Sequence, residues 1–275
     1  MKRLKIAIIW WFDKAEETYV NWRDGHRAAF EELAKYHDVD FILGKRLPNY
    51  QPDFLLFWDD SNSEVFDHID KYDCRKGICL TTDPWNMNNL RRLDVVFVES
   101  DPIYNKVRAE GIRCIKAFGT DTDFFKPNDK IKKDIEYFYP ATFSPWKLQR
   151  DIAYLGDKLT CIGTVQPDGQ EDLEACKKTG VNIEEGYFPV EKIRDYYWRT
   201  KHIIIPAIHG SERTVLEAMA CNILPEVINH GNVRTHSYIL EFNKWKETHS
   251  GTPRDFILEN YSHIKFCDQL RRGIE

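Results

Sequence analysis

The sequence predicts an α/β protein built from two doubly wound, mostly parallel sheets. Short runs of β-branched and aromatic residues alternate with stretches whose apolar residues recur at helical spacing. Continuous apolar strands separated by helices are typical of parallel sheets covered on both faces. The pattern restarts after the polar, proline-containing segment Lys126–Asp134, and a length of 275 residues suits two compact domains better than one.

The first half of the chain opens on the buried-strand pattern Lys5–Trp11 (KIAIIWW). This apolar run is short, ends at Asp13 and lacks a small-residue cleavage site, so it indicates a strand rather than a signal peptide. Further strands are expected at Val39–Leu43, Asp53–Trp58, Gly77–Leu80, Val95–Val98 and Arg113–Ala117. Helices are expected at Gly25–Tyr36 and at about Pro102–Glu110.

The second half repeats this alternation. Strands are expected at Ile135–Tyr139, Leu159–Ile162, Val181–Ile183 and Ile203–Pro206. Helices are expected at Trp146–Leu155, Gln170–Lys178, Val190–Arg199 and Arg213–Cys221, and the tail Pro253–Ile274 reads as a long amphipathic helix with one break. We therefore expect an N-terminal domain over residues 1–126, a C-terminal domain over 127–252, and a closing helix over 253–275 that packs back on the first domain.

Charge and cysteine usage narrow the function classes. The formal net charge of −5 provides no overall field that attracts nucleic acid, so no nucleic-acid partner is expected. The seven cysteines are odd in number and form no C-x-x-C pair or zinc-type cluster, which favours reduced thiols in a cytoplasmic protein. No run approaches the roughly 20 apolar residues of a membrane span, so no transmembrane segment is expected.

The segment Ile203–Cys221 (IIIPAIHGSERTVLEAMAC) carries the strongest chemical signal. A buried strand ends at Pro206, a glycine-containing loop follows, and a helix starts near Glu212 or Arg213. The N-terminus of such a helix presents unpaired N–H groups and the positive end of its dipole, which together favour a phosphate. Gly210 permits close backbone approach, and Ser211 and Thr214 add hydroxyl donors.

Glu217 lies one turn further along this predicted helix. Its carboxylate is well placed to accept hydrogen bonds from the two hydroxyls of a ribose. The structural alternative is that Ser211 caps the helix and Glu217 pairs with Arg213 at i,i+4. Spacing alone favours the structural alternative.

Leu216–Ala220 (LEAMA) resembles the donor-binding motif of the group 1, retaining glycosyltransferases of the GT-B fold. In that family a strand ends in proline and a glycine-containing loop leads into a helix with this sequence. Glu217 matches the glutamate that binds ribose. His209 stands where the family has a glutamate that contacts the donor sugar, so the resemblance implies either a lost contact or replacement by the imidazole.

Further segments match the family in the same order. Gly119–Pro127 (GTDTDFFKP) is similar to its interdomain signature, and Lys147 stands where the family has a phosphate-binding lysine. Thr142 replaces the arginine that usually precedes this lysine, and Arg150 or Arg213 is expected to supply the charge. Tyr187-Phe188-Pro189 resembles the turn beside the nucleotide base. The tail Leu258–Leu270 resembles the closing helix of the family.

The Asp-x-Asp sequence at Asp121–Asp123 also occurs as the metal signature of the other large glycosyltransferase fold. Here it lies inside the interdomain signature, so no metal site is predicted. Asp59-Asp60 follows a predicted strand and is expected to be a solvated turn.

The N-terminal half offers fewer site residues. Trp10 or Trp11, at the end of the first strand, could stack on an acceptor sugar, with core or interdomain packing as the alternative. Many relatives carry a histidine after the fourth strand. The corresponding stretch here is Thr81–Trp85, where Asp83 is the nearest polar candidate and a turn role before proline is the alternative.

The resemblance thus implies the GT-B fold, with two Rossmann-like domains facing across a cleft, and a retaining, metal-independent hexosyltransferase, for which the cysteine usage favours the cytoplasm. No cofactor is expected beyond a UDP- or GDP-linked sugar, and the acceptor is a saccharide, a lipid-linked compound or another hydroxyl. The expected catalytic residues are Lys147, Asp83 and His209. The expected donor-binding residues are Arg150, Tyr187, Phe188, Pro189, Gly210, Ser211, Glu212, Arg213, Thr214 and Glu217. The alternatives are a catalytically silent nucleotide-sugar-binding module of the same fold and a sugar-nucleotide epimerase. A Rossmann dehydrogenase is disfavoured because no G-x-G-x-x-G follows the first strand.

Overall fold

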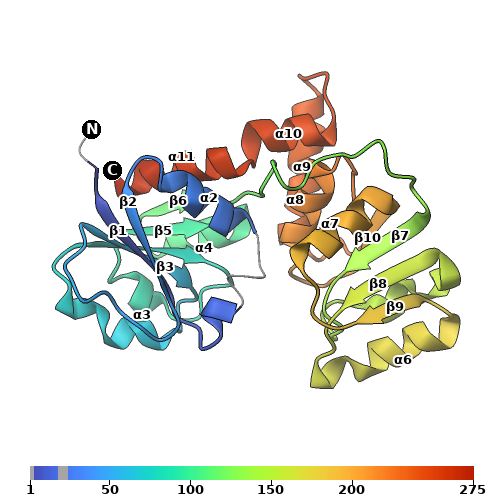
Figure 1. Ribbon diagram of the computed structural model, residues 1–275, viewed down its shortest axis with the longest axis horizontal. Helices are drawn as coiled ribbons and strands as arrows, with labels where there is room; N and C mark the ends of the chain where they lie inside the picture. The colour runs from blue at the N-terminus through green and yellow to red at the C-terminus, as the bar shows by residue number, and fades with distance from the viewer. Residues whose placement is uncertain (1–2, 18–23) are drawn as a thin grey trace. The chain divides into compact units, whose positions relative to one another are not determined.

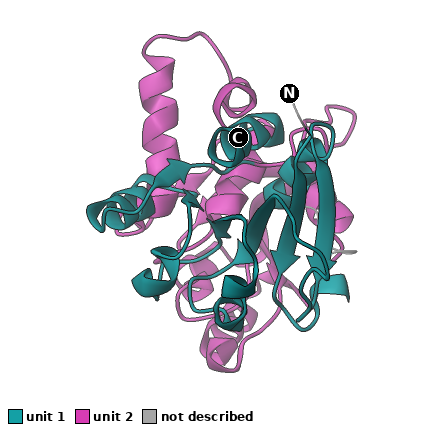
Figure 2. Ribbon diagram, turned by 90° about the vertical axis from the view of Figure 1, so that its left-hand side faces the viewer, with its two compact units in different colours: residues 1–119, 262–275 teal, residues 120–261 magenta. Residues whose placement is uncertain are grey.

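Two parallel sheets organise the chain. A computed structural model describes residues 3–17 and 24–275. The chain divides into two compact units: unit 1 comprises Met1–Gly119 and Ser262–Glu275, and unit 2 comprises Thr120–Tyr261 (Figure 2). These divisions fall at 119/120 and 261/262, whereas the sequence suggested 126/127 and 252/253.

Unit 1 contains a six-stranded parallel sheet with the strand order β2-β1-β3-β4-β5-β6 (Figure 1). Its strands are β1 (Lys5–Trp10), β2 (Asp38–Leu43), β3 (Phe54–Asp59), β4 (Arg75–Leu80), β5 (Val95–Val98) and β6 (Cys114–Lys116). Each predicted strand of the first half is present. The chain moves from β1 to β2 on one side and then returns to place β3 on the other side of β1, so the direction of winding switches between β1 and β3.

Alternation along the strands gives this sheet two apolar faces. In β1, Ile6, Ile8 and Trp10 point to one face, whereas Ala7 and Ile9 point to the other. The first face is covered by α2 (Gly25–Leu33) and α11 (His263–Ile274). The second is covered by η1 (Glu64–Asp67), η2 (Ile69–Lys71), α3 (Met87–Leu90) and α4 (Asp101–Ala109). Both faces are therefore buried, as the unbroken apolar strands predicted.

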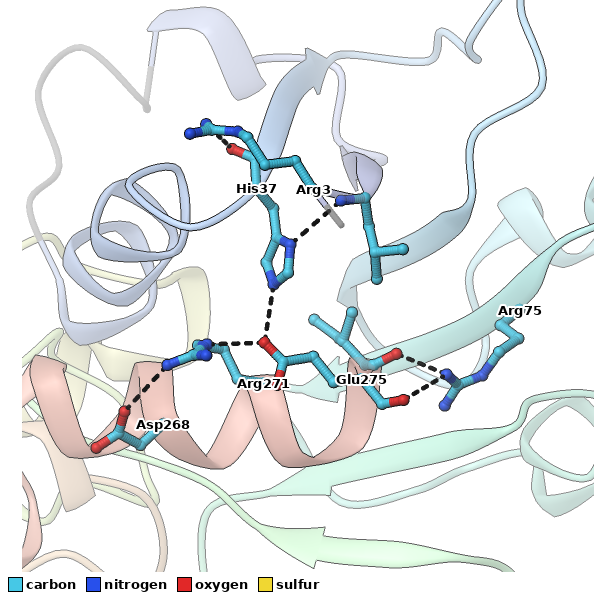
Figure 3. A network of polar contacts seen from close by, with 8 residues as sticks. Arg3, His37, Arg75, Asp268, Arg271 and Glu275 are labelled. Carbon is cyan, nitrogen blue, oxygen red and sulfur yellow. Dashed lines mark hydrogen bonds and ion pairs between the residues drawn. The ribbon is translucent and has the colours of Figure 1, made fainter. Parts of the chain in front are cut away.

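The end of α11 is fixed to unit 1 by polar contacts (Figure 3). The guanidinium of Arg75 donates to the carbonyls of Gly273 at 2.8 Å and Ile274 at 2.6 Å. These carbonyls lie in the last turn of the helix, where no intrahelical partner is available. The imidazole Nε2 of His37 lies 3.2 Å from Oε1 of Glu275. These polar contacts fix the C-terminal end of α11, while its apolar face packs on the sheet of unit 1, whose strands come from the first half of the chain.

Unit 2 contains a five-stranded parallel sheet with the strand order β11-β10-β7-β8-β9. Its strands are β7 (Ile135–Pro140), β8 (Leu159–Gly163), β9 (Asn182–Glu185), β10 (Thr200–Ile205) and β11 (Glu226–Val227). The chain winds from β7 through β8 to β9 and then returns to place β10 beside β7. The winding direction therefore switches between β7 and β10.

The helices of unit 2 largely follow the prediction. They are α5 (Gln149–Ile152), η3 (Ala153–Lys158), η4 (Pro167–Gly169), α6 (Gln170–Thr179), α7 (Val190–Arg199), α8 (Glu212–Ala220), α9 (Val233–Lys246) and α10 (Pro253–Asn260). The continuous helix expected at Trp146–Leu155 is wrong. Positive φ angles at Leu148 (52°) and Gly156 (57°) leave only one α-helical turn and a distorted 3₁₀ segment.

The break predicted in the tail is confirmed. Helix α10 ends at Asn260, and α11 begins at His263 with Ser262 as its N-cap, whose side chain accepts from the N–H of Lys265. The start of α10 is fixed by a capping box between Thr252 and Asp255. Within the described ranges, none of the helices combines the length and the apolarity needed to cross a membrane.

Candidate functional site

The candidate site lies at the carboxyl edge of the unit 2 sheet. Strands β7 and β10 pair in parallel, with Ile203 opposite Phe138. Their outgoing loops lead to opposite sides of the sheet, because β7 is followed by β8 and β10 by β11. Open parallel sheets form a crevice where neighbouring loops part in this way. The segments 141–148 and 206–211 leave β7 and β10 at this point, which is where such a sheet is expected to take a ligand.

The loop between β10 and α8 has an unusual backbone. Gly210 and Ser211 both have positive φ angles, of 74° and 75°. For serine this left-handed conformation costs about 1–2 kcal/mol, so surrounding contacts must hold it. The side chain of Ser211 does not cap α8, which makes the capping alternative wrong. Its hydroxyl instead lies 3.1 Å from Nζ of Lys147 and 3.2 Å from the hydroxyl of Tyr139.

Lys147 brings a positive charge to this loop. Its ammonium donates to Oγ of Ser211 and lies 3.4 Å from the carbonyl of His209. Burial lowers the pKa of Lys147, the nearby carboxylate of Glu212 opposes that shift, and Arg213 adds to it. A Cβ on residue 210 would lie 2.5 Å from this ammonium, so glycine allows the close approach. A partly desolvated cation thus meets the N-terminus of α8, and this pairing favours an anion.

Glu217 lies in α8 and is buried, with 6% of its surface exposed. Its Oε2 accepts from the hydroxyl of Tyr197 at 3.1 Å, and its Oε1 lies 3.3 Å from Nε of Arg213. The i,i+4 pair of the structural alternative is therefore present. The side chain of Thr214 is also buried in this part of α8. The carboxylate is held in place by two donors from two helices.

His209 presents an exposed ring at the same loop. The imidazole stacks on the indole of Trp146, with ring centroids 5.8 Å apart and planes at 21°. The N–H of Ile208 donates to the carbonyl of Trp146 at 2.8 Å, which ties the two loops together. His209 is thus held beside Lys147 through its carbonyl and beside Trp146 through its ring.

The contacts of Arg150 are with α6 and not with Lys147. Its backbone N–H donates to Asp172 at 3.1 Å, and its guanidinium lies 3.4 Å from Glu171. Both carboxylates belong to α6. Thr142, which stands in place of the family arginine, bonds to the hydroxyl of Thr164 at 3.0 Å. Of the two candidates for the missing charge, only Arg213 lies on the helix that begins at the loop.

The turn Tyr187–Pro189, which the sequence places beside a nucleotide base, lies between β9 and α7. Tyr187 is largely exposed, and Pro189 is the N-cap residue of α7. The ring of Phe188 carries the ammonium of Lys192 at 4.4 Å from its centroid. This turn follows the carboxyl end of β9, at the same edge of the sheet as the Lys147 loop.

The three candidates in the N-terminal half lie in unit 1. Trp10 is buried and stacks on Trp58 with a centroid distance of 4.2 Å, which matches the packing alternative. Trp11 is half-buried and packs on the opposite face of the sheet. Asp83 is exposed in the loop after β4.

Asp121 has a local structural role. Its Oδ1 accepts from the backbone N–H groups of Asp123 and Phe124, both at 3.1 Å. Such bonds are typical of an Asx turn at the start of a loop. Asp59, in contrast to the solvated turn expected, is partly buried at the end of β3 and accepts from the hydroxyl of Ser63 at 2.9 Å.

The sequence did not predict the residues that hydrogen-bond to the loop between β10 and α8 and hold it in place. Tyr139 lies in β7, Asn232 is the N-cap residue of α9, and Thr235 lies in the first turn of α9, a helix that was not predicted. Asn232 donates to the carbonyls of Ala207 and Gly210, both at 3.1 Å. An asparagine directly before the helix, here Asn232 before Val233, is a typical N-cap residue and was the signal that could have located this start.

Three solved structures with the same architecture are glycosyltransferases. AviGT4, a glycosyltransferase involved in avilamycin A biosynthesis, is 12% identical, with a TM-score of 0.62 over 98% of this chain and 97% of that chain. The β-glucosyltransferase of T4 phage is 14% identical, with a TM-score of 0.61 over 98% and 99%. The lipopolysaccharide outer core galactosyltransferase WaaB is 13% identical, with a TM-score of 0.55 over 98% and 99%.

The fold is the GT-B fold of glycosyltransferases. The prediction of this fold from the LEAMA segment and its ordered companions is confirmed. No family model matches the chain, and no curated protein matches its sequence. The chain spans about half the length of the GtfA and TarM chains that it also resembles, covering 55–57% of them.

Proposed function

We propose that the chain is a glycosyltransferase that binds a nucleotide-sugar at the carboxyl edge of the unit 2 sheet. One observation carries this proposal: the ammonium of Lys147 meets the Gly210–Ser211 loop at the start of α8. The place is a switch point of a fold shared with sugar-transferring enzymes. A cation and a helix N-terminus that converge there suit the diphosphate of a nucleotide-sugar.

The chemistry follows from charge. Breaking the bond between the sugar and the diphosphate leaves negative charge on the leaving oxygen, which preorganised donors stabilise. Lys147 and the N–H groups at residues 210–213 supply that stabilisation without a metal ion. We assign Glu217 and Thr214 to the ribose side, and Tyr187, Phe188 and Pro189 to the base. His209 is assigned to the donor sugar.

The donor is proposed from solved structures with this fold, and the acceptor from the sequence resemblance. The β-glucosyltransferase structure was determined with the substrate uridine diphosphoglucose, and pneumococcal GtfA was determined with UDP and GlcNAc. We therefore propose a UDP-linked hexose as the first donor to test, followed by a GDP-linked one. The acceptor is a hydroxyl of a saccharide or of a lipid-linked compound, and transfer proceeds with retention of configuration.

The thiols support a cytoplasmic site of action. All seven cysteines lie among the described residues and are free, and six of them are buried. Burial raises the pKa of Cys114, Cys221 and Cys267 to about 12, so these thiols stay protonated and unreactive at neutral pH. Such cysteines suit a reducing compartment.

A silent nucleotide-sugar-binding module is the second candidate. Two observations favour it: α6 carboxylates engage Arg150, and a histidine stands at position 209. A silent module would bind the donor without consuming it.

Two measurements separate these functions. A thermal-shift series with UDP, GDP and their hexose conjugates reports binding, because a ligand of the native state alone raises the melting temperature. The second measurement is release of free sugar from the bound donor, and slow hydrolysis detected in this way identifies a transferase. Binding without hydrolysis or transfer identifies the silent module, and no shift with any compound would contradict both.

A further inference from the structure

Two side chains at the start of α9, those of its N-cap residue Asn232 and of Thr235, hold the loop that leads into α8. The amide of Asn232 donates to the carbonyls of Ala207 and Gly210, and the hydroxyl of Thr235 donates to the same Gly210 carbonyl at 2.6 Å. Both side chains are buried. The Oδ1 of Asn232 accepts from the N–H of Thr235 at 3.2 Å, so the bonding pattern fixes which side of the amide carries the nitrogen.

These bonds determine which way two peptide groups face. A trans peptide is planar, so its C=O and N–H point in opposite directions. The Ala207 carbonyl faces Asn232, and the N–H of the same peptide, on Ile208, donates to the carbonyl of Trp146. The side of this loop that faces away from α9 therefore faces the other loop, the one after β7, which carries Trp146 and Lys147.

The Gly210–Ser211 peptide is held in the same sense. Its carbonyl takes two donors from α9, so the N–H of Ser211 is turned away from α9. This N–H donates to no group among residues 3–17 and 24–275. The hydroxyl of the same residue contacts the ammonium of Lys147.

We propose that Asn232 and Thr235 are positioning residues that aim the N–H of Ser211 at the donor diphosphate. The inference rests on the proposed function and adds to it two residues that touch no substrate. Without them, the Gly210 carbonyl would be free to rotate toward the anion and repel it. The strained φ of Ser211 would also lose the contacts that keep it in place.

The test uses Thr235→Val, which keeps the size of the side chain and removes its hydroxyl. The matched control is Thr200→Val. Thr200 is equally buried, and its hydroxyl donates to the carbonyl of Tyr196 at the same 2.6 Å, but it lies at the amino end of β10. Calorimetry gives the affinities of each protein for UDP and for uridine, and thermal melting checks the fold.

We expect Thr235→Val to weaken UDP binding about tenfold, as for one charge-assisted hydrogen bond, and to leave uridine binding within twofold. Thr235→Ser should restore UDP binding, and Thr200→Val should change neither affinity. Equal losses for UDP and uridine, or an unchanged affinity for UDP, would overturn the positioning role while leaving the donor site intact. Absence of any UDP or GDP binding by the wild type would overturn both.

If Thr235→Val does not fold, an NMR titration of the wild-type protein tests the same proposal. The ¹⁵N-labelled chain is titrated with UDP and separately with uridine. We expect the Ser211 amide proton to shift downfield with UDP alone, because a new acceptor meets it. An amide that shifts equally with both ligands, or with neither, contradicts the proposal.

Discussion

The two sheets of this chain have the same parallel construction but opposite chemistry at their switch points. In unit 2, between β7 and β10, the outgoing loops carry Lys147 and the strained Ser211. In unit 1, between β1 and β3, aromatic rings pack at the corresponding strand ends. Trp10 stacks on Trp58, and the ring of His26 lies over the same indole at 5.8 Å.

The difference shows what a parallel sheet supplies and what its loops supply. The sheet produces a crevice wherever the winding reverses, irrespective of sequence. The loop residues then decide whether that place holds charge for a ligand or apolar rings for packing. The unit 2 edge has the charge that a diphosphate requires, whereas Trp10 and Trp58 are committed to the core of unit 1.

Removing the indole at the centre of the unit 1 stack should have the largest effect. Trp58 is 3% exposed and also meets Phe30 edge-on at 5.5 Å. Trp58→Ala should lower the stability of unit 1 by about 3–5 kcal/mol through lost contacts and a cavity. Hydrogen exchange followed separately in the two units measures this, and UDP binding at low temperature should persist. The control Trp85→Ala removes an exposed indole and should leave both units unchanged.

Removing the ammonium of Lys147 from unit 2 should have the next largest effect, which is on turnover. Lys147→Met keeps most of the side-chain length and removes the ammonium beside Ser211. Turnover, measured as sugar transfer or donor hydrolysis, should fall about 10²–10³-fold, with little change in melting temperature. Lys201→Met is the matched control, because this exposed lysine of the same unit pairs with Glu136 at 2.6 Å. Turnover like that of the wild type would remove Lys147 from the chemistry.

The ribose assignment of Glu217 predicts a smaller effect. Glu217→Ala should weaken UDP binding by about 1.5–3 kcal/mol, the range for hydrogen bonds to a charged group. If the carboxylate binds ribose hydroxyls, the wild type should prefer UDP over 2′-deoxy-UDP, and the variant should lose that preference. Equal losses for the two ligands would indicate that Glu217 acts only through its contacts with Tyr197 and Arg213.

Replacing Asp59, at the unit 1 switch point, should have the smallest effect, which is on the pH dependence of stability. Burial raises its pKa to about 6, while hydrogen bonds from Asp60 and Ser63 oppose the shift. The unfolded chain therefore binds fewer protons than the folded one between about pH 4 and pH 6, and stability falls as the pH rises through that window. Asp59→Asn should remove this dependence and add about 1–2 kcal/mol at pH 7. Thermal melting at pH 4.5 and pH 7 tests it, and an unchanged slope would count against the buried carboxylate.

All strands except β11 could be predicted because local periodicity indicates them, whereas the two residues of β11, Glu226–Val227, are too few to show a periodicity. Runs such as Lys5–Trp11 and Ile203–Pro206 are apolar on both faces, which only a covered parallel sheet satisfies. Helix α9 was missed because its start depends on the N-cap bonds of Asn232 rather than on a clear apolar stripe. The helix at Trp146–Leu155 was overpredicted because Leu148 adopts a positive φ that no local pattern signals.

The candidate site was predictable in its composition but not in its contacts. Gly210, Ser211 and Lys147 were chosen by motif and lie together in the structure. Arg150 fits the same motif argument, yet the carboxylates of Glu171 and Asp172 engage it, and both are distant in sequence. Long-range pairings of this kind depend on tertiary packing, which a single sequence does not reveal.

Unit 1 is assembled from two stretches separated by the whole of unit 2. Phe266, Leu270 and Ile274, from the second stretch, complete one side of its core. During synthesis, the first stretch leaves the ribosome with only α2 on that side of its sheet, so the part that α11 later covers is exposed to water. Unit 2, in contrast, is continuous and can close first. At about 5–20 residues per second, the delay is on the order of ten seconds. In that interval the nascent chain offers an apolar sheet face to chaperones and to neighbouring nascent chains.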